Sequence, residues 1–128
     1  MRVYLPMSHS DLVRFLADQR FEADKLFAPT PAFLSDNQEC DDEEIEYRLS
    51  VLAGEAAREV RLSKTAPGLV LAIELDQAQC GESDEDSLTL TAPIIWSQVQ
   101  CALLLPADGD ELIWFATQEI AQELDGWK

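Results

Sequence analysis

The chain has 128 residues, of which 47% are apolar, so a domain with a hydrophobic core is expected and wholesale disorder is excluded. Its three cysteines, Cys40, Cys80 and Cys101, are widely spaced and odd in number, which excludes a disulfide scaffold and predicts free thiols in a reducing compartment. The formal net charge of −16 opposes binding to nucleic acid or to an anionic membrane surface, because both need lysines and arginines.

The first residues of the chain and the uncharged run 87–107 indicate where the protein is located, and the distribution of its basic residues indicates what kind of partner it has. Residues 1–6 lack the apolar stretch of a signal peptide, and the uncharged run 87–107 contains prolines and hydroxyl groups that favour a folded interior over lipid. We therefore predict a single domain over residues 1–128, located in the cytoplasm. No basic residue lies between Lys64 and Lys128, which favours a basic protein as partner.

The first predicted elements are a strand and a capped helix. Residues 2–6 have the pattern of a short strand that ends at a proline. Ser8 and Asp11 then match a capping box, which predicts a short helix that fades near Gln19. A second short strand is predicted over 25–29.

The middle of the chain carries the clearest element. Thr30 before Pro31 predicts the start of a brief helix, and residues 41–64 predict a long one. The first turn of the long segment is acidic and its last turns are basic, which complements the helix dipole. Its apolar residues recur at helical spacing: Ile45, Leu49, Leu52, Ala56 and Val60.

The second half is predicted to be rich in strands. The apolar run 69–75 is typical of a central strand covered on both faces. An acidic loop is expected over 77–86, followed by a half-exposed strand over 88–91. Residues 94–99 predict one helical turn, and 100–105 predict another strand.

The end of the chain allows two interpretations. A tight turn at 108–109 predicts a hairpin into a strand over 112–116, after which Thr117 would cap a short helix through Leu124. One continuous helix over 110–124 is the alternative. The element order predicts an α+β fold: a mixed or mostly antiparallel sheet of about five to six strands, with one long and one or two short helices packed on one face.

Motifs for catalysis are missing from the sequence. No Cys-x-x-Cys pair occurs, and the only histidine, His9, is expected to face solvent at a helix start. Neither a phosphate-binding loop nor a dinucleotide fingerprint nor a Gly-x-Ser-x-Gly elbow is found, so we predict no cofactor and no catalytic residue.

Carboxylates are the only candidate metal ligands. Within the acidic start of the long helix, Asp42 and Glu46 lie one turn apart and share a face, so they are the candidate pair for a divalent cation. The acidic loop 82–86 resembles part of a calcium loop but lacks its central glycine and distal glutamate. Solvated surface charge is the alternative for both clusters.

An aromatic and polar segment near the end is the candidate interaction site. Aromatic side chains beside hydrogen-bonding ones are common at binding surfaces, which singles out Trp114, Gln118 and Glu119. The alternative is that Trp114 or Phe115 belongs to the core and that Glu119 lies in a solvated turn.

Three segments together resemble a known family. Met1–Pro6 (MRVYLP), Glu44–Tyr47 (EIEY) and Trp114–Glu119 (WFATQE) are similar to a family of small acidic actinobacterial proteins of unknown function. The resemblance implies an actinobacterial, cytoplasmic protein. It implies no activity, substrate or cofactor.

Three functional hypotheses follow. The first is a non-enzymatic interaction or regulatory module that recognises a basic partner or associates with a second copy as a homodimer. The second is a small protein or enzyme that binds a divalent metal through carboxylates. The third is an acidic mimic of nucleic acid, which would need acids spaced along an extended face.

Overall fold

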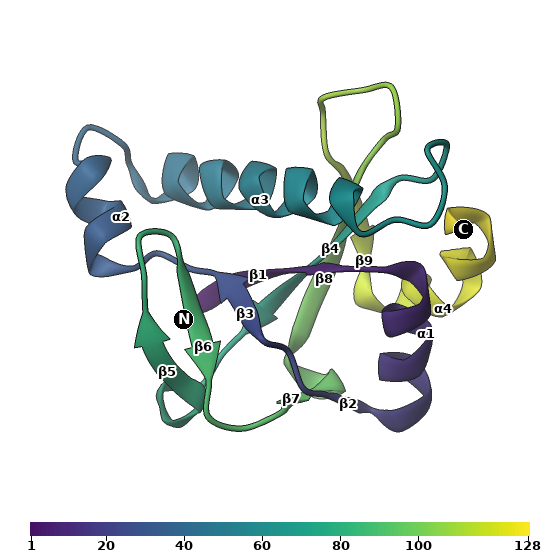
Figure 1. Ribbon diagram of the computed structural model, residues 1–128, viewed down its shortest axis with the longest axis horizontal. Coiled ribbons are helices and arrows are strands. Elements are labelled where there is room, and N and C mark those ends of the chain that lie inside the picture. The colour runs from purple at the N-terminus through teal and green to yellow at the C-terminus, as the bar shows by residue number, and fades with distance from the viewer.

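Seven strands form one antiparallel sheet in the computed structural model, which describes residues 1–128 (Figure 1). Their order is β5-β6-β3-β1-β4-β8-β9, and a separate ribbon joins β2 to β7. The strands are β1 (Arg2–Met7), β2 (Arg20–Phe21), β3 (Lys25–Phe27), β4 (Gly68–Glu74), β5 (Cys80–Ser83), β6 (Ser87–Leu90), β7 (Ile94–Ile95), β8 (Val99–Leu105) and β9 (Ile113–Ala116).

Four α-helices accompany the sheet, and local caps start the first three. Ser8 accepts the amide of Asp11 at 3.2 Å, Thr30 accepts that of Phe33 at 3.1 Å, and the carboxylate of Asp41 accepts that of Glu44 at 2.9 Å. The helices are α1 (His9–Asp18), α2 (Pro31–Asp36), α3 (Asp42–Glu59) and α4 (Ile120–Glu123), with single 3₁₀ turns η1 (Gln77–Gln79), η2 (Trp96–Gln98), η3 (Thr117–Glu119) and η4 (Leu124–Trp127).

The helices cover both faces of the sheet (Figure 1). Helix α3 packs on the face that carries Tyr4, Val70 and Ala72, whereas α1 and the C-terminal helices pack on the opposite face. That second core is larger and includes Leu12, Phe15, Leu71, Ile73, Ile120 and Trp127. None of the helices has both the length and the apolar character needed to cross a membrane.

The predicted α+β class and antiparallel sheet are confirmed, with two differences in detail. The sheet has seven strands rather than five or six, because part of the predicted acidic loop forms β5 and pairs with β6. The helices lie on two faces rather than one. The cause is β4, which is apolar on both sides and therefore requires cover on both sides.

Other elements differ from prediction at their ends. Helix α3 ends at Glu59 instead of Lys64, and Arg61 donates to the carbonyl of Ala66 at 3.0 Å, which holds the chain turning into β4. The segment 94–98, predicted as part of one helical turn, forms strand β7 followed by the 3₁₀ turn η2. Strand β2, which pairs with β7, is absent from the prediction because a strand of two residues carries almost no sequence pattern.

The C-terminal region follows the strand-and-helix interpretation. Strand β9 pairs with β8, so one continuous helix over 110–124 is wrong. Thr117 does not cap the helix through its side chain. Its hydroxyl donates to the carbonyl of Val99 at 3.1 Å, while the carboxylate of Glu119 accepts the amide of Ala116 at 2.8 Å.

Two glycines bring α3 close to β4. A Cβ at Gly68 would lie 2.8 Å from the Gly54 carbonyl oxygen and 3.2 Å from the Arg58 nitrogen, both in the α3 backbone. At Gly54, by contrast, an added Cβ would meet side-chain atoms of Leu105, the nearest at 3.2 Å. The backbone of a helix cannot yield as a leucine side chain can, so only Gly68 requires the absence of a side chain.

Gly68→Ala should therefore lower the free energy of unfolding by about 2 kcal/mol, because α3 must move away from the sheet. Gly54→Ala is the matched control. Its free energy of unfolding should fall by less than about 1 kcal/mol, since the better helix propensity of alanine offsets the close contact with Leu105. Urea unfolding of both variants measures the difference. Equal losses would contradict the close approach of the two backbones.

Tyr4 is a buried phenol in the core under α3, where it is 4% exposed. Burial raises the pKa of Tyr4 from 10.0 to about 12, the charge of Glu46 adds to this rise, and the charge of Arg2 opposes it. An acid whose folded pKa lies above its unfolded pKa stabilises the fold below the unfolded value, and that contribution is lost as pH rises toward the folded value. The affected window is therefore pH 10 to about 12.

Tyr4→Phe should remove this alkaline dependence. One pH unit above the ordinary tyrosine pKa, wild type should have lost about 1.4 kcal/mol more of its unfolding free energy, relative to neutral pH, than the variant. The measurement is urea unfolding at about pH 8 and about pH 11. Tyr47→Phe, at an exposed position on α3, should behave as wild type, and an identical loss in all three proteins would contradict the assignment.

Candidate functional site

Strand β9 ends the sheet and exposes two large apolar side chains. It pairs on one side with β8, where Trp114 lies opposite Leu103 and Ile113 lies opposite Leu104. Trp114 is 60% exposed and Ile113 is 49% exposed. Neighbouring residues of a strand point to opposite faces, so the edge presents an apolar side chain on each face.

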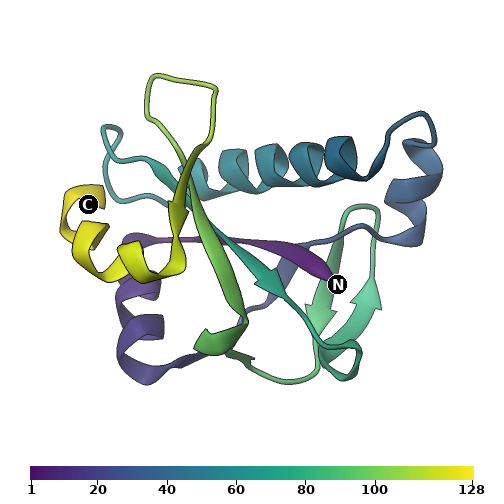
Figure 2. The same ribbon diagram turned by 180° about the vertical axis from the view of Figure 1, so that it is seen from behind.

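The loop before β9 is fixed to the end of α3. Arg58 donates from Nη2 to the carbonyl oxygens of Pro106 and Gly109. In Figure 2 the β8–β9 hairpin crosses in front of α3 and its loop projects beyond the helix. Arg58 therefore ties the loop between β8 and β9 to the C-terminal part of α3.

The free side of β9 has backbone groups available for pairing. The amide of Ala116 points away from β8, because it donates to the Glu119 carboxylate. Backbone groups alternate in direction along a strand, so the amide and carbonyl of Trp114 point the same way. Neither a side chain nor a loop hydrogen-bonds to them.

Trp114 is supported from behind by the sheet. Cys101 is buried beneath it on the α3 face, and burial raises the pKa of the Cys101 thiol. The charge of Arg2 and the neighbouring Trp114 indole act in the opposite direction. Trp114 is thus held on one side against β8 and open to solvent on the other.

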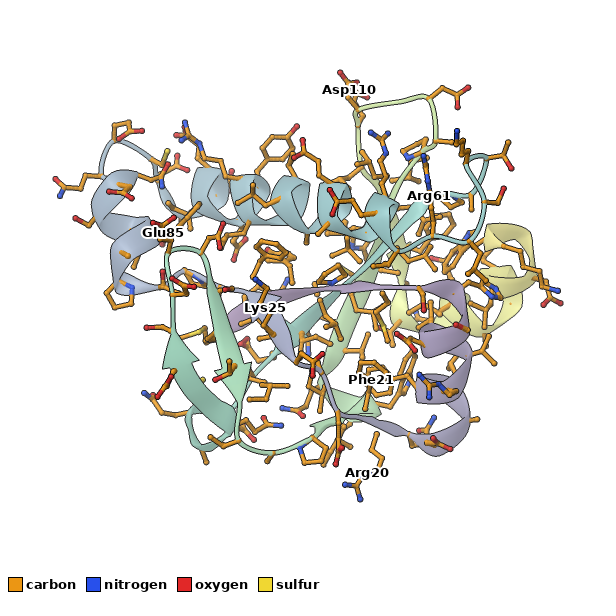
Figure 3. All side chains as sticks on the ribbon, in the orientation of Figure 1. Arg20, Phe21, Lys25, Arg61, Glu85 and Asp110 are labelled. Atoms are coloured by element: carbon orange, nitrogen blue, oxygen red, sulfur yellow. The ribbon has the colours of Figure 1, made fainter.

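Acidic side chains border the exposed edge. The loop leading into β9 carries exposed Asp108, Asp110 and Glu111, of which Asp110 is labelled at its tip in Figure 3. On this side of the molecule, the cations Arg2 and Arg58 are partly buried, and Arg58 is engaged with loop carbonyls. The exposed charged residues of the loop leading into β9 are therefore all acidic.

The opposite edge of the sheet is built differently. Strand β5 carries Gly81 and exposed Glu82, and the turn after it, where Figure 3 labels Glu85, adds further acids. Charged side chains on an edge strand discourage pairing with another strand. Strand β9 has no charged residue between Ile113 and Ala116, so it is the less protected edge.

The three predicted interaction residues lie on or just after β9, but they differ in exposure and in how far their polar groups are already hydrogen-bonded. Of the two aromatics that the alternative assigned to the core, Trp114 is exposed, whereas Phe115 is half-buried against the core and packs on Trp127 with ring centroids 5.0 Å apart. Gln118 is exposed in η3, and Glu119 is already bonded to the Ala116 amide. An interaction role for Trp114, Gln118 and Glu119 stays a prediction.

The predicted metal ligands are not gathered. Asp42 and Glu46 are both exposed on α3, and no three His, Cys, Asp or Glu side chains lie close enough together to hold a metal ion. Glu46 instead faces the region of Tyr4, whose pKa it raises. Metal binding by Asp42 and Glu46 stays a prediction.

His9 has a different position from the one expected. It is half-buried, and its Nε2 lies 2.8 Å from the carbonyl oxygen of Leu124, so it ties the start of α1 to the C-terminal segment. No local pattern in the sequence predicts this contact, because the two residues are 115 positions apart. The part played by Arg58 was missed for the same reason.

The largest hollow on the surface lies between α1 and the β2–β3 segment, with a volume of about 1030 Å³. Its walls carry both signs of charge. Arg14 pairs with Asp11, and Arg20 lies 3.9 Å from Glu22. Asp18, Asp24 and Lys25 also line this hollow, so four acids and three bases are mixed along its walls and no single sign of charge is collected there.

Comparison with known proteins gives a family and no activity. The model of a family of unknown function, DUF6912, matches residues 1–104, which extend from β1 through all but the last residue of β8, so β9 lies beyond the matched segment. No curated protein and no solved structure matches the chain. The actinobacterial origin implied by the resemblance stays a prediction. The chain belongs to the DUF6912 family, a family of unknown function.

Proposed function

We propose that the protein is a non-enzymatic interaction module whose β9 edge accepts an extended segment of a basic partner. One observation carries the proposal: an exposed tryptophan, Trp114, lies on an unpaired edge strand that is bordered by acids. A partner strand would pair with the free backbone groups of β9, which is the usual route of strand addition to a sheet.

Charge favours a basic partner over a second copy. A peptide with lysines or arginines at alternate positions would bring its cations toward Asp108, Asp110 and Glu111. Its guanidinium groups could also stack on the exposed ring of Trp114. Two copies paired through β9 would instead bring together two chains that each carry a formal charge of −16, so a homodimer through this edge is the less favourable occupant.

The proposal can be tested with a synthetic peptide of alternating arginine and valine, against a control peptide of alternating glutamine and valine. The basic peptide should bind at low salt and shift the indole N–H signal of Trp114 in a ¹⁵N–¹H spectrum. Trp114→Ala should weaken binding by at least about tenfold, as expected for a central aromatic anchor. Tyr47→Ala, at an exposed aromatic on α3, is the matched control and should bind as wild type. Equal losses in both variants, or equal binding of both peptides, would refute the proposal.

Hydrogen exchange separates strand addition from docking of side chains alone. With the basic peptide bound, the amide of Trp114 should exchange at least about tenfold more slowly, because it gains a backbone acceptor. The amide of Glu82 on the opposite edge should keep its rate. Unchanged exchange at Trp114 in a saturated complex would exclude pairing with β9. A size measurement of the free protein detects a homodimer.

A further inference from the structure

A second, smaller pocket lies at the junction of α1, the loop after α3 and the C-terminal segment. Its volume is about 370 Å³, which falls within the range of about 300–1,000 Å³ usual for small-molecule sites. Its apolar wall consists of Met7, Leu62, Ala66, Pro67, Leu69 and Trp127. Figure 3 labels Arg61 where the chain leaves α3, on the side of the C-terminal segment.

The charges that line this pocket are opposite in sign to the protein as a whole. The cations Arg61 and Lys128 line it together with His9, and no aspartate or glutamate does, so the charged side chains of its wall are all basic. The largest hollow, by comparison, includes four acids, and the hollow at the start of α3 includes three. A pocket that excludes every one of 25 acidic side chains while collecting cations is suited to an anion.

The polar groups of the pocket are only partly used within the chain. His9 donates from Nε2 to the carbonyl of Leu124, since a carbonyl oxygen can only accept. Arg61 uses Nη1 to bond the Ala66 carbonyl, and no other bond of its guanidinium is formed. A guanidinium carries five N–H donors, so most of those of Arg61 are available to a ligand. Lys128 forms no ion pair with any carboxylate.

We propose that this pocket binds a small organic acid with an apolar body. The apolar part would lie against Met7, Leu69 and Trp127, and the acid group would be held by Arg61 and Lys128. A carboxylate suits the planar guanidinium of Arg61, which can donate two parallel hydrogen bonds to it. The pocket is distinct from the β9 edge, so the two proposals can fail separately.

The first test compares octanoate with 1-octanol, which has a similar chain and no charge. Titrations followed by ¹⁵N–¹H spectra should show the indole signal of Trp127 moving, whereas that of Trp114 on β9 stays in place. Octanoate should bind at least about fivefold more tightly than 1-octanol, given the energy of a single close charge pair near a protein surface. Equal affinities would refute the proposal, as would shifts that leave Trp127 unmoved.

Matched variants locate the anion within the pocket. Leu62 is 85% exposed at the rim, so Leu62→Glu adds a repelling charge without disturbing the core and should weaken octanoate by about fivefold or more. Val13→Glu adds the same charge at an exposed position on α1 away from the pocket and should leave binding unchanged. Lys128→Gln should weaken octanoate but not 1-octanol, whereas Lys25→Gln should affect neither. Equal effects in a variant and its control would mean that net charge, not the pocket, governs binding.

Discussion

Burial of β4 on both faces is the constraint on which the rest of the structure depends. Every residue of this strand except Glu74 is buried, so apolar cover is needed above and below it. Helix α3 supplies one cover, and its backbone approaches closely at Gly68. The opposite cover comes from α1 and the C-terminal helices, which are joined to each other by His9. With β4 between β1 and β8, the remaining strands occupy the flanks, and β9 becomes an edge.

The two edges of the sheet have opposite properties, and side chains rather than backbone make the difference. Both β5 and β9 are short and antiparallel to their neighbours. Acidic residues on and after β5 make the approach of another strand costly, whereas β9 carries Trp114 and Ile113 with no charge among them. Tryptophan is the residue type most enriched among the side chains that dominate binding energy, so under the proposed function β9 is the edge at which a partner would gain most.

Local interactions could be predicted from the sequence, and long-range ones could not. The caps at Ser8 and Thr30 involve residues three positions apart, so their patterns are visible in the chain, whereas Asp41, predicted as the first residue of the long helix, is its cap. Neighbouring residues of a strand such as Trp114 and Phe115 face opposite ways, but the sequence does not show which face is covered, because this depends on where the helices pack. Strand β5 escaped prediction because Gly81 and Glu82 have low strand propensity, and pairing with β6 outweighs this. The pocket around His9, Arg61 and Lys128 joins three remote segments and leaves no local pattern.

The net charge of this protein determines how it attracts or repels a molecule at long range, but not which groups that molecule meets on contact. The formal charge of −16 governs the field felt by an approaching molecule, and that field fades over about 8 Å at physiological ionic strength. Within contact range the local side chains decide, and they differ between the edge, bordered by Asp108, Asp110 and Glu111, and the pocket lined by Arg61 and Lys128. Salt should therefore act on the two sites in different ways. It weakens the long-range attraction of a basic partner to β9, whereas for an organic acid it removes a long-range repulsion, and in both cases the closest charge contacts are less affected. A strongly acidic surface is thus compatible with both kinds of ligand, provided that each is recognised by groups it touches directly.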